Sequence, residues 1–94
     1  MNSQHSKTKT SYYRRLYIAY LIDSGVNTVP LIMQHIGMPR RTAQDTIKAL
    51  AEMDIVCKFE GATKDGCYVI TDWSAIKKEW IKSNLQHVLY VLEY

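Results

Sequence analysis

The side chains best suited to chemistry in this sequence are four basic or amide groups between residues 40 and 48. Arg40 and Arg41 are adjacent, and Gln44 and Lys48 follow at intervals of three and four residues. On an α-helix this spacing places all four on one side. A guanidinium can bind guanine through two hydrogen bonds, and a glutamine amide can bind adenine in the same way. The pattern is typical of a helix that lies in the major groove of duplex DNA.

The neighbouring residues fit the same helix, which we predict over residues 39–53. The Thr42 hydroxyl suits a phosphate contact, and Asp45 stands four residues after Arg41, the spacing of a helical ion pair. The side of the helix opposite the basic groups repeats small apolar residues with helical spacing: Ala43, Ile47 and Leu50.

Positive charge gathers in the first half of the chain. Residues 1–50 carry seven Lys or Arg against two acidic residues, whereas residues 51–94 carry five against seven. Residues 1–10 are polar and are predicted to form a disordered basic arm. The basic residues outside the predicted helix that could contact DNA are Arg14, Arg15 and Lys64, with Lys7 and Lys9 in the arm. Such a group can also serve only as a solubilising tail.

Two further helices are predicted ahead of the basic one. Thr28 can cap a helix that has Pro30 in its first turn, and Gly37 supplies the left-handed backbone that ends it. Apolar residues at helical spacing predict an earlier helix over residues 11–24, which Gly25 ends.

After residue 54 the apolar pattern changes to strands. Residues 55–60 alternate in polarity, 61–66 form a turn cluster between two glycines, and 67–71 predict a second strand. We expect a β-hairpin over residues 56–70, with Lys64 near its tip. A long last helix follows over residues 73–94, which contain neither Gly nor Pro.

These elements resemble the winged helix-turn-helix family. Residues 37–56, GMPRRTAQDTIKALAEMDIV, look like its turn, recognition helix and entry to the wing, with Asp54 where many members have Gly. The stretch 68–73 is similar to a group of small prokaryotic proteins in which Asp-Trp-Gly follows the wing, although Ser74 replaces that Gly here. The resemblance covers residues 11–80. It implies a mainly α fold with a small β-hairpin, in the order α-α-α-β-β-α, and transcriptional regulation through DNA binding.

The C-terminal helix is predicted to pair two copies of the chain, which divides the chain into an arm at 1–10, a winged domain at 11–72 and a dimerisation helix at 73–94. The seam would consist of apolar residues at coiled-coil spacing: Ile81, Leu85, Val88, Leu89 and Leu92. Two-fold pairing would suit a palindromic operator. The alternative is that this helix folds onto residues of its own first helix: Tyr13, Leu16, Tyr17 and Tyr20.

Cys57 and Cys67 are interpreted as ordinary strand residues. A hairpin centred on Thr63 would place Cys57 opposite Val69 rather than opposite Cys67. Their spacing matches no zinc motif.

The leading hypothesis is a sequence-specific DNA-binding regulator that acts as a homodimer on double-stranded DNA. Two alternatives stay open: a winged helix used for protein–protein contact or as an anti-regulator, and a redox sensor based on the two cysteines. No catalytic motif is present, so we expect no enzyme, cofactor or metal. The sequence has no apolar run that could span a membrane, and we expect a cytoplasmic protein.

Overall fold

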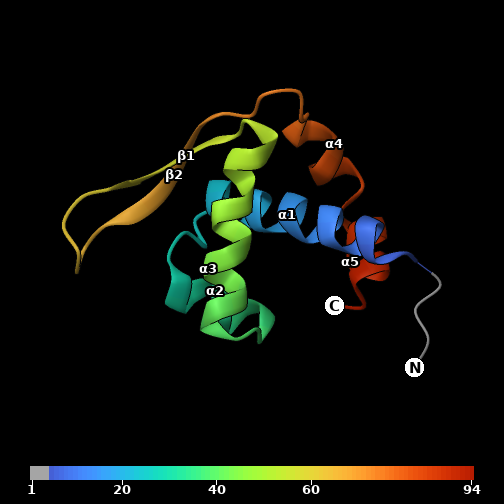
Figure 1. The fold of residues 1–94 in the computed structure, drawn as a ribbon, viewed down its shortest axis with the longest axis horizontal. Helices are drawn as coiled ribbons and strands as arrows, with labels where there is room; N and C mark the ends of the chain where they lie inside the picture. The colour runs from blue at the N-terminus through green and yellow to red at the C-terminus, as the bar shows by residue number, and fades with distance from the viewer. Residues whose placement is uncertain (1–4) are drawn as a thin grey trace.

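A computed structural model describes residues 5–94 as helices that cross around a small core, with a hairpin that extends away from them (Figure 1). The molecule measures 41 × 28 × 22 Å. The elements in chain order are α1 (Lys7–Asp23), α2 (Val29–Ile36), α3 (Arg40–Ala49), the 3-10 helix η1 (Leu50–Met53), β1 (Val56–Glu60), β2 (Cys67–Asp72), α4 (Lys78–Ser83) and α5 (Leu85–Leu92). This order confirms the predicted fold class.

The turn between α2 and α3 forms as the sequence predicts. Thr28 caps α2, since its Oγ1 accepts a hydrogen bond from the Leu31 N–H at 3.2 Å. Gly37 ends α2 with a left-handed φ of 82°. After α3 and η1, Asp54 adopts a left-handed φ of 60° and turns the chain into β1, a conformation that aspartate tolerates better than most residues.

Helix α1 begins earlier than the sequence suggested. The Ser6 hydroxyl accepts the Lys9 N–H at 3.0 Å and caps a helix that starts at Lys7. Residues 7–10 are therefore helical rather than part of a disordered arm, and residues 1–4 lie outside the described part of the chain.

The main core lies where α1, α2 and α3 meet, with η1 and the start of the hairpin beside it. Its fully buried members include Ile18 from α1, Ile32 from α2, and Ala43 and Leu50 from α3 and η1. Figure 1 shows α3 crossing α1, with α2 at the lower end of α3. This core fixes α3 on its inner side and leaves its outer side exposed.

The hairpin pairs one residue away from the predicted register. Cys57 lies opposite Ile70, not Val69, and the last pair is Glu60 with Cys67. The loop that joins Glu60 and Cys67 has an even number of residues, 61–66. The hairpin is therefore centred between Thr63 and Lys64 instead of on Thr63. Because side chains alternate between faces, the shift places Cys57 and Cys67 on opposite faces of the hairpin.

The predicted long C-terminal helix is broken into α4 and α5. The side chain of Asp72 accepts the Ser74 N–H at 2.7 Å, which forms a turn rather than a helix cap, and Ser74 has φ 55°. Helix α4 consequently starts at Lys78. At Asn84 the backbone leaves helical geometry with φ −115° and ψ 24°, while its side-chain amide donates to the Trp80 carbonyl at 2.8 Å.

Both C-terminal helices fold back onto α1 of the same chain. Ile81 and Val88 are fully buried, and Leu92 is 9% exposed. Val88 and Leu92 form a second cluster with Tyr17 and Leu21. Two other predicted seam residues, Leu85 and Leu89, are partly buried against the same cluster. The predicted dimer seam is thus covered within one chain, and the alternative, packing on the first helix, describes what the structure shows.

Candidate nucleic-acid interface

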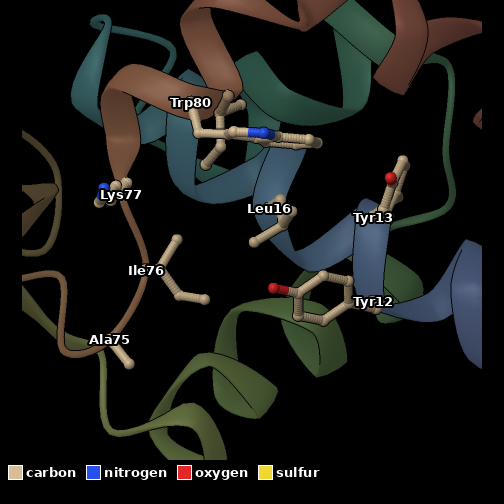
Figure 2. A pocket seen from close by; sticks show the side chains of 8 residues that line it. Tyr12, Tyr13, Leu16, Ala75, Ile76, Lys77 and Trp80 are labelled. Atoms are coloured by element: carbon tan, nitrogen blue, oxygen red, sulfur yellow. The ribbon is translucent and has the colours of Figure 1, made fainter.

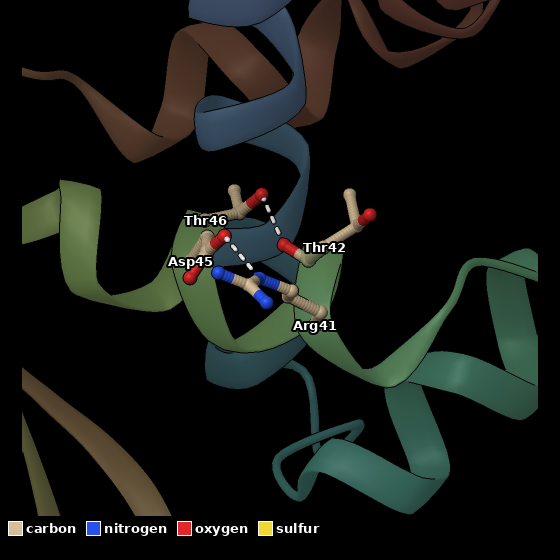
Figure 3. Close-up of polar contacts among 4 residues, drawn as sticks. All are labelled: Arg41, Thr42, Asp45 and Thr46. Atoms are coloured by element: carbon tan, nitrogen blue, oxygen red, sulfur yellow. Dashed lines mark hydrogen bonds and ion pairs between the residues drawn. The ribbon is translucent and has the colours of Figure 1, made fainter.

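The outer side of α3 is a charged, exposed surface. Arg40, Arg41, Gln44 and Lys48 are all exposed, as predicted from their spacing. Arg41 Nε lies 3.9 Å from Asp45 Oδ2 (Figure 3), and the two side chains are 93% and 66% exposed. An ion pair this open to solvent contributes little free energy, so Arg41 can exchange Asp45 for another anion at low cost.

The inner side of α3 is held by the core and by its own backbone. Ala43 and Ile47 are buried. Thr46 is the buried polar residue, and its hydroxyl donates to the Thr42 carbonyl at 2.7 Å, which satisfies it without a partner from the core (Figure 3). The Thr42 hydroxyl itself makes no hydrogen bond within residues 5–94, so it can donate to a phosphate oxygen.

Arg40 and Arg41 occupy the first turn of α3, which begins after Pro39 without a side-chain cap. Cations at this end oppose the helix dipole, so their position adds nothing to helix stability. Helix stability therefore does not explain why two arginines stand at this position. Binding of an anionic partner would explain it.

One flank of α3 faces the hairpin. A hollow of about 490 Å³ separates the helix from the strands. Its lining includes Gln44 and Lys48 from α3, with Cys57 and Tyr68 from the hairpin. The Tyr68 N–H donates to the Asn27 carbonyl at 2.8 Å and so ties the hairpin to the loop after α1. This hydrogen bond joins the hairpin to the helical part of the chain.

The other flank of α3 faces α1. A hollow of about 240 Å³ brings Arg14 and Arg15 beside Thr42 and Asp45. In the sequence these two arginines were grouped with Lys7 and Lys9 as one basic set, although both fall within the helix predicted over residues 11–24. Arg14 and Arg15 stand three and four residues after Ser11, which lines the same hollow. This spacing places the three residues on one side of a helix, and it is the signal in the sequence that could have grouped them. Basic groups therefore stand on α3 and on α1 next to it.

Lys64 is set apart from these groups. It lies in the exposed loop 61–66 at the tip of the hairpin, the far end of the molecule from α5 (Figure 1). The structure therefore does not bring Lys64 into the cluster formed by α3 and α1.

The two cysteines are not placed for a bond to each other. Cys67 is three residues along β2 from Ile70, the partner of Cys57, a separation of roughly 10 Å along the strand. A disulfide needs Cα atoms within about 7 Å. Both thiols are free and partly buried, and burial raises the pKa of Cys57.

Residues 5–94 offer neither a metal site nor a membrane-spanning helix. Those residues contain no group of His, Cys, Asp or Glu side chains arranged to hold a metal ion. None of the helices there has the length and apolar character needed to cross a membrane.

Comparison with known proteins agrees with this geometry. A family described as winged helix-turn helix matches residues 7–92. The crystal structure of a DUF2131 family protein from Shewanella amazonensis SB2B superposes with a TM-score of 0.89 at 30% sequence identity, covering 98% of this chain and 92% of that one. No curated protein matches the chain. The chain belongs to the winged helix-turn helix family.

Proposed function

We propose that this protein is a sequence-specific, double-stranded-DNA-binding regulator of transcription, with α3 in the major groove. The observation that carries the proposal is the outer side of α3, where three exposed cations and an exposed glutamine stand on a helix whose inner side is fixed in the core. An α-helix with its side chains is about 10–12 Å in diameter and fits a major groove about 12 Å wide.

The surroundings of α3 support this binding mode. Arg14 and Arg15 lie on one flank of the helix and the hairpin lies on the other. A helix inserted in the major groove has a phosphate backbone on each side, so both flanks would meet phosphates. Lys64 at the hairpin tip would reach the backbone further along the duplex.

The alternative of a protein-binding winged helix fits this surface less well. Interfaces between proteins are enriched in exposed aromatic and apolar anchors. The large hydrophobic residues exposed within residues 5–94 all lie outside α3: Tyr12, Leu31, Phe59, Trp80, Tyr90 and Tyr94. DNA binding also agrees with a non-catalytic role, as expected from the sequence.

We further propose that two copies bind a palindromic operator. Each bidentate base contact discriminates by about 1–3 kcal/mol, and one short helix offers only a few such contacts, so a second copy would double the discrimination. Because three of the five predicted seam residues are buried and the other two are partly buried, the contact would use the outer side of α5, where Tyr90 is 66% exposed. Sedimentation velocity tests this: the wild type should run at twice the 10.9 kDa chain mass, and Tyr90→Glu as a monomer. A wild type that stays monomeric at micromolar concentration and on DNA contradicts pairing.

A gel-shift experiment tests DNA binding itself. We expect the wild type to shift duplex DNA from upstream of its own gene more strongly than a shuffled duplex, with lower affinity at higher salt. Arg40→Ala/Arg41→Ala should lose the preference for the upstream duplex. Lys82→Ala, which removes one positive charge from the exposed surface of α4, should retain that preference. A double variant that folds and binds with unchanged affinity contradicts the proposal.

A further inference from the structure

Another cavity lies on the far side of α1 from Arg14 and Arg15. It has a volume of about 320 Å³ and opens between α1 and residues 75–81, the segment that leads from the hairpin into α4 (Figure 2). The residues that form its walls include Tyr12, Tyr13 and Leu16 from α1, and Ile76, Lys77 and Trp80 from the facing segment.

The walls of this cavity are mostly apolar, yet water reaches them. Leu16 and Ile81 are buried beneath it, while Tyr12 and Trp80 at its edge are 40% and 42% exposed. The Tyr13 ring meets the Trp80 ring edge-on at 6.3 Å between centroids, which holds the indole in place. An apolar ligand in the cavity would remove these rings from water, and a flat ring would suit the indole face.

Two polar groups border the apolar walls. Lys77 is exposed and has no ion-pair partner within residues 5–94. By contrast, Nζ of its neighbour Lys78 lies 3.6 Å from Oδ2 of Asp23. Figure 2 shows the Tyr12 hydroxyl directed across the cavity toward Ile76. That hydroxyl makes no hydrogen bond to any other described residue. A cation and a hydroxyl donor beside an apolar hollow are the groups that would bind a carboxylate.

We propose that this cavity binds a small aromatic carboxylate, with its ring against Trp80 and Leu16 and its carboxylate toward Lys77 and the Tyr12 hydroxyl. The volume is at the lower end of the range for small-molecule sites, about 300–1,000 Å³, and suits an acid of one or two rings. The proposal does not depend on DNA binding, since the cavity shares no residue with the α3 surface.

A two-dimensional NMR titration of the full chain with 2-naphthoate tests the site without DNA. The side-chain indole signal of Trp80 should shift saturably, with a Kd of about 1 mM or tighter. The Trp73 indole, which does not line the cavity, should not shift. Neutral 2-naphthamide should bind about two- to five-fold more weakly, the effect of one exposed ion pair.

Variants locate the ligand. Lys77→Gln should weaken 2-naphthoate about two- to five-fold and leave 2-naphthamide unchanged. Lys82→Gln removes the same charge from exposed surface of α4 outside the cavity and should have no effect. Ala75→Phe places a ring in the cavity and should abolish binding of both ligands, and a dispersed spectrum of this variant would show that it folds. If it does not fold, Tyr12→Phe takes its place and should weaken only the carboxylate.

Three results would overturn the proposal. The first is a Trp80 signal that does not shift at several times the expected Kd. The second is binding that Lys77→Gln leaves unchanged. The third is a Trp80 signal that shifts with protein concentration alone, which would make the cavity a contact between two copies of the chain.

Discussion

Helices α3 and α5 are both short and amphipathic, and both bury their apolar side within the chain, but their outer sides differ. In α3 the apolar side lies in the main core, and the outer side exposes three cations with Gln44 and Asp45. In α5 the apolar side packs on α1 of the same chain, and Tyr90 is the one large apolar residue left on its outer side. The comparison teaches that an apolar stripe shows which side of a helix is covered, but not which element covers it.

The largest expected effect concerns the covered side of the C-terminal helices. Ile81→Ala should lower the free energy of unfolding by about 2–5 kcal/mol, because Ile81 is fully buried. Lys82→Ala, on the exposed side of α4, should change it by less than about 0.5 kcal/mol. Urea unfolding at two protein concentrations measures both. A loss for Ile81→Ala that appears only at the protein concentration at which the wild type is paired would instead place this residue between two chains.

The next effect concerns the exposed side of α3. Arg40→Ala should weaken binding to a preferred duplex by about 1–3 kcal/mol, if Arg40 binds a base pair, and should relax the preference at that position alone. Competition with single-base variants of the site measures this. If all the duplexes weaken equally, Arg40 contacts phosphate, and base recognition belongs to Arg41, Gln44 or Lys48.

Arg14 on the α1 flank should behave differently from Arg40. Arg14→Gln should weaken binding to all duplexes alike. It should also make the negative slope of log K against log salt less steep by about 1, because the side chain would neutralise one phosphate. Affinities at three salt concentrations provide the slope. An unchanged slope would remove α1 from the interface.

Asp45 should oppose DNA binding slightly. Asp45→Asn removes a negative charge near the phosphates and releases Arg41, whose Nε lies 3.9 Å from it. We expect DNA affinity to rise by roughly 0.2–1 kcal/mol, the scale of an exposed ion pair. A loss of affinity, measured on the same duplex, would instead show that Asp45 orients Arg41 or accepts from a cytosine.

The smallest effect concerns Cys57, whose pKa is raised by burial. A raised pKa means less thiolate at neutral pH, so iodoacetamide should modify Cys57 more slowly in the folded chain than in urea. The modification rate should rise with pH in both forms, and the pH at which it reaches half its maximum should be higher in the folded chain than in urea. A Cys67→Ser background isolates this thiol. Equal rates in the folded and unfolded chains at pH 7 would contradict a buried thiol and revive the redox alternative.

Local signals in the sequence were enough to predict the helix-turn-helix half of the fold. Thr28, Gly37 and the apolar spacing of Ala43, Ile47 and Leu50 act within one or two turns, and all behave as expected. The capping of α1 by Ser6 was also a local signal, but the polar composition around it concealed it.

The remaining differences come from balances that the sequence pattern does not determine. The hairpin register depends on a shift of one residue in a loop rich in turn formers. The break at Asn84 arises because a side-chain amide binds the Trp80 carbonyl inside an otherwise unbroken apolar pattern. The apolar side that contains Ile81 and Val88 could pack either on α1 of the same chain or on a second copy of the chain, and the spacing of the residues does not decide between the two. Within the candidate site, Arg14 and Arg15 lie beside α3 only because of how α1 crosses it.

The central claim, that the outer side of α3 recognises base pairs, is tested most directly by selection from a random duplex library. The wild-type protein should enrich a defined sequence, and Arg40→Ala/Arg41→Ala should retain its helical circular dichroism but enrich none. Enrichment of the same sequence by the folded double variant, or of no sequence by the wild type, would contradict the account.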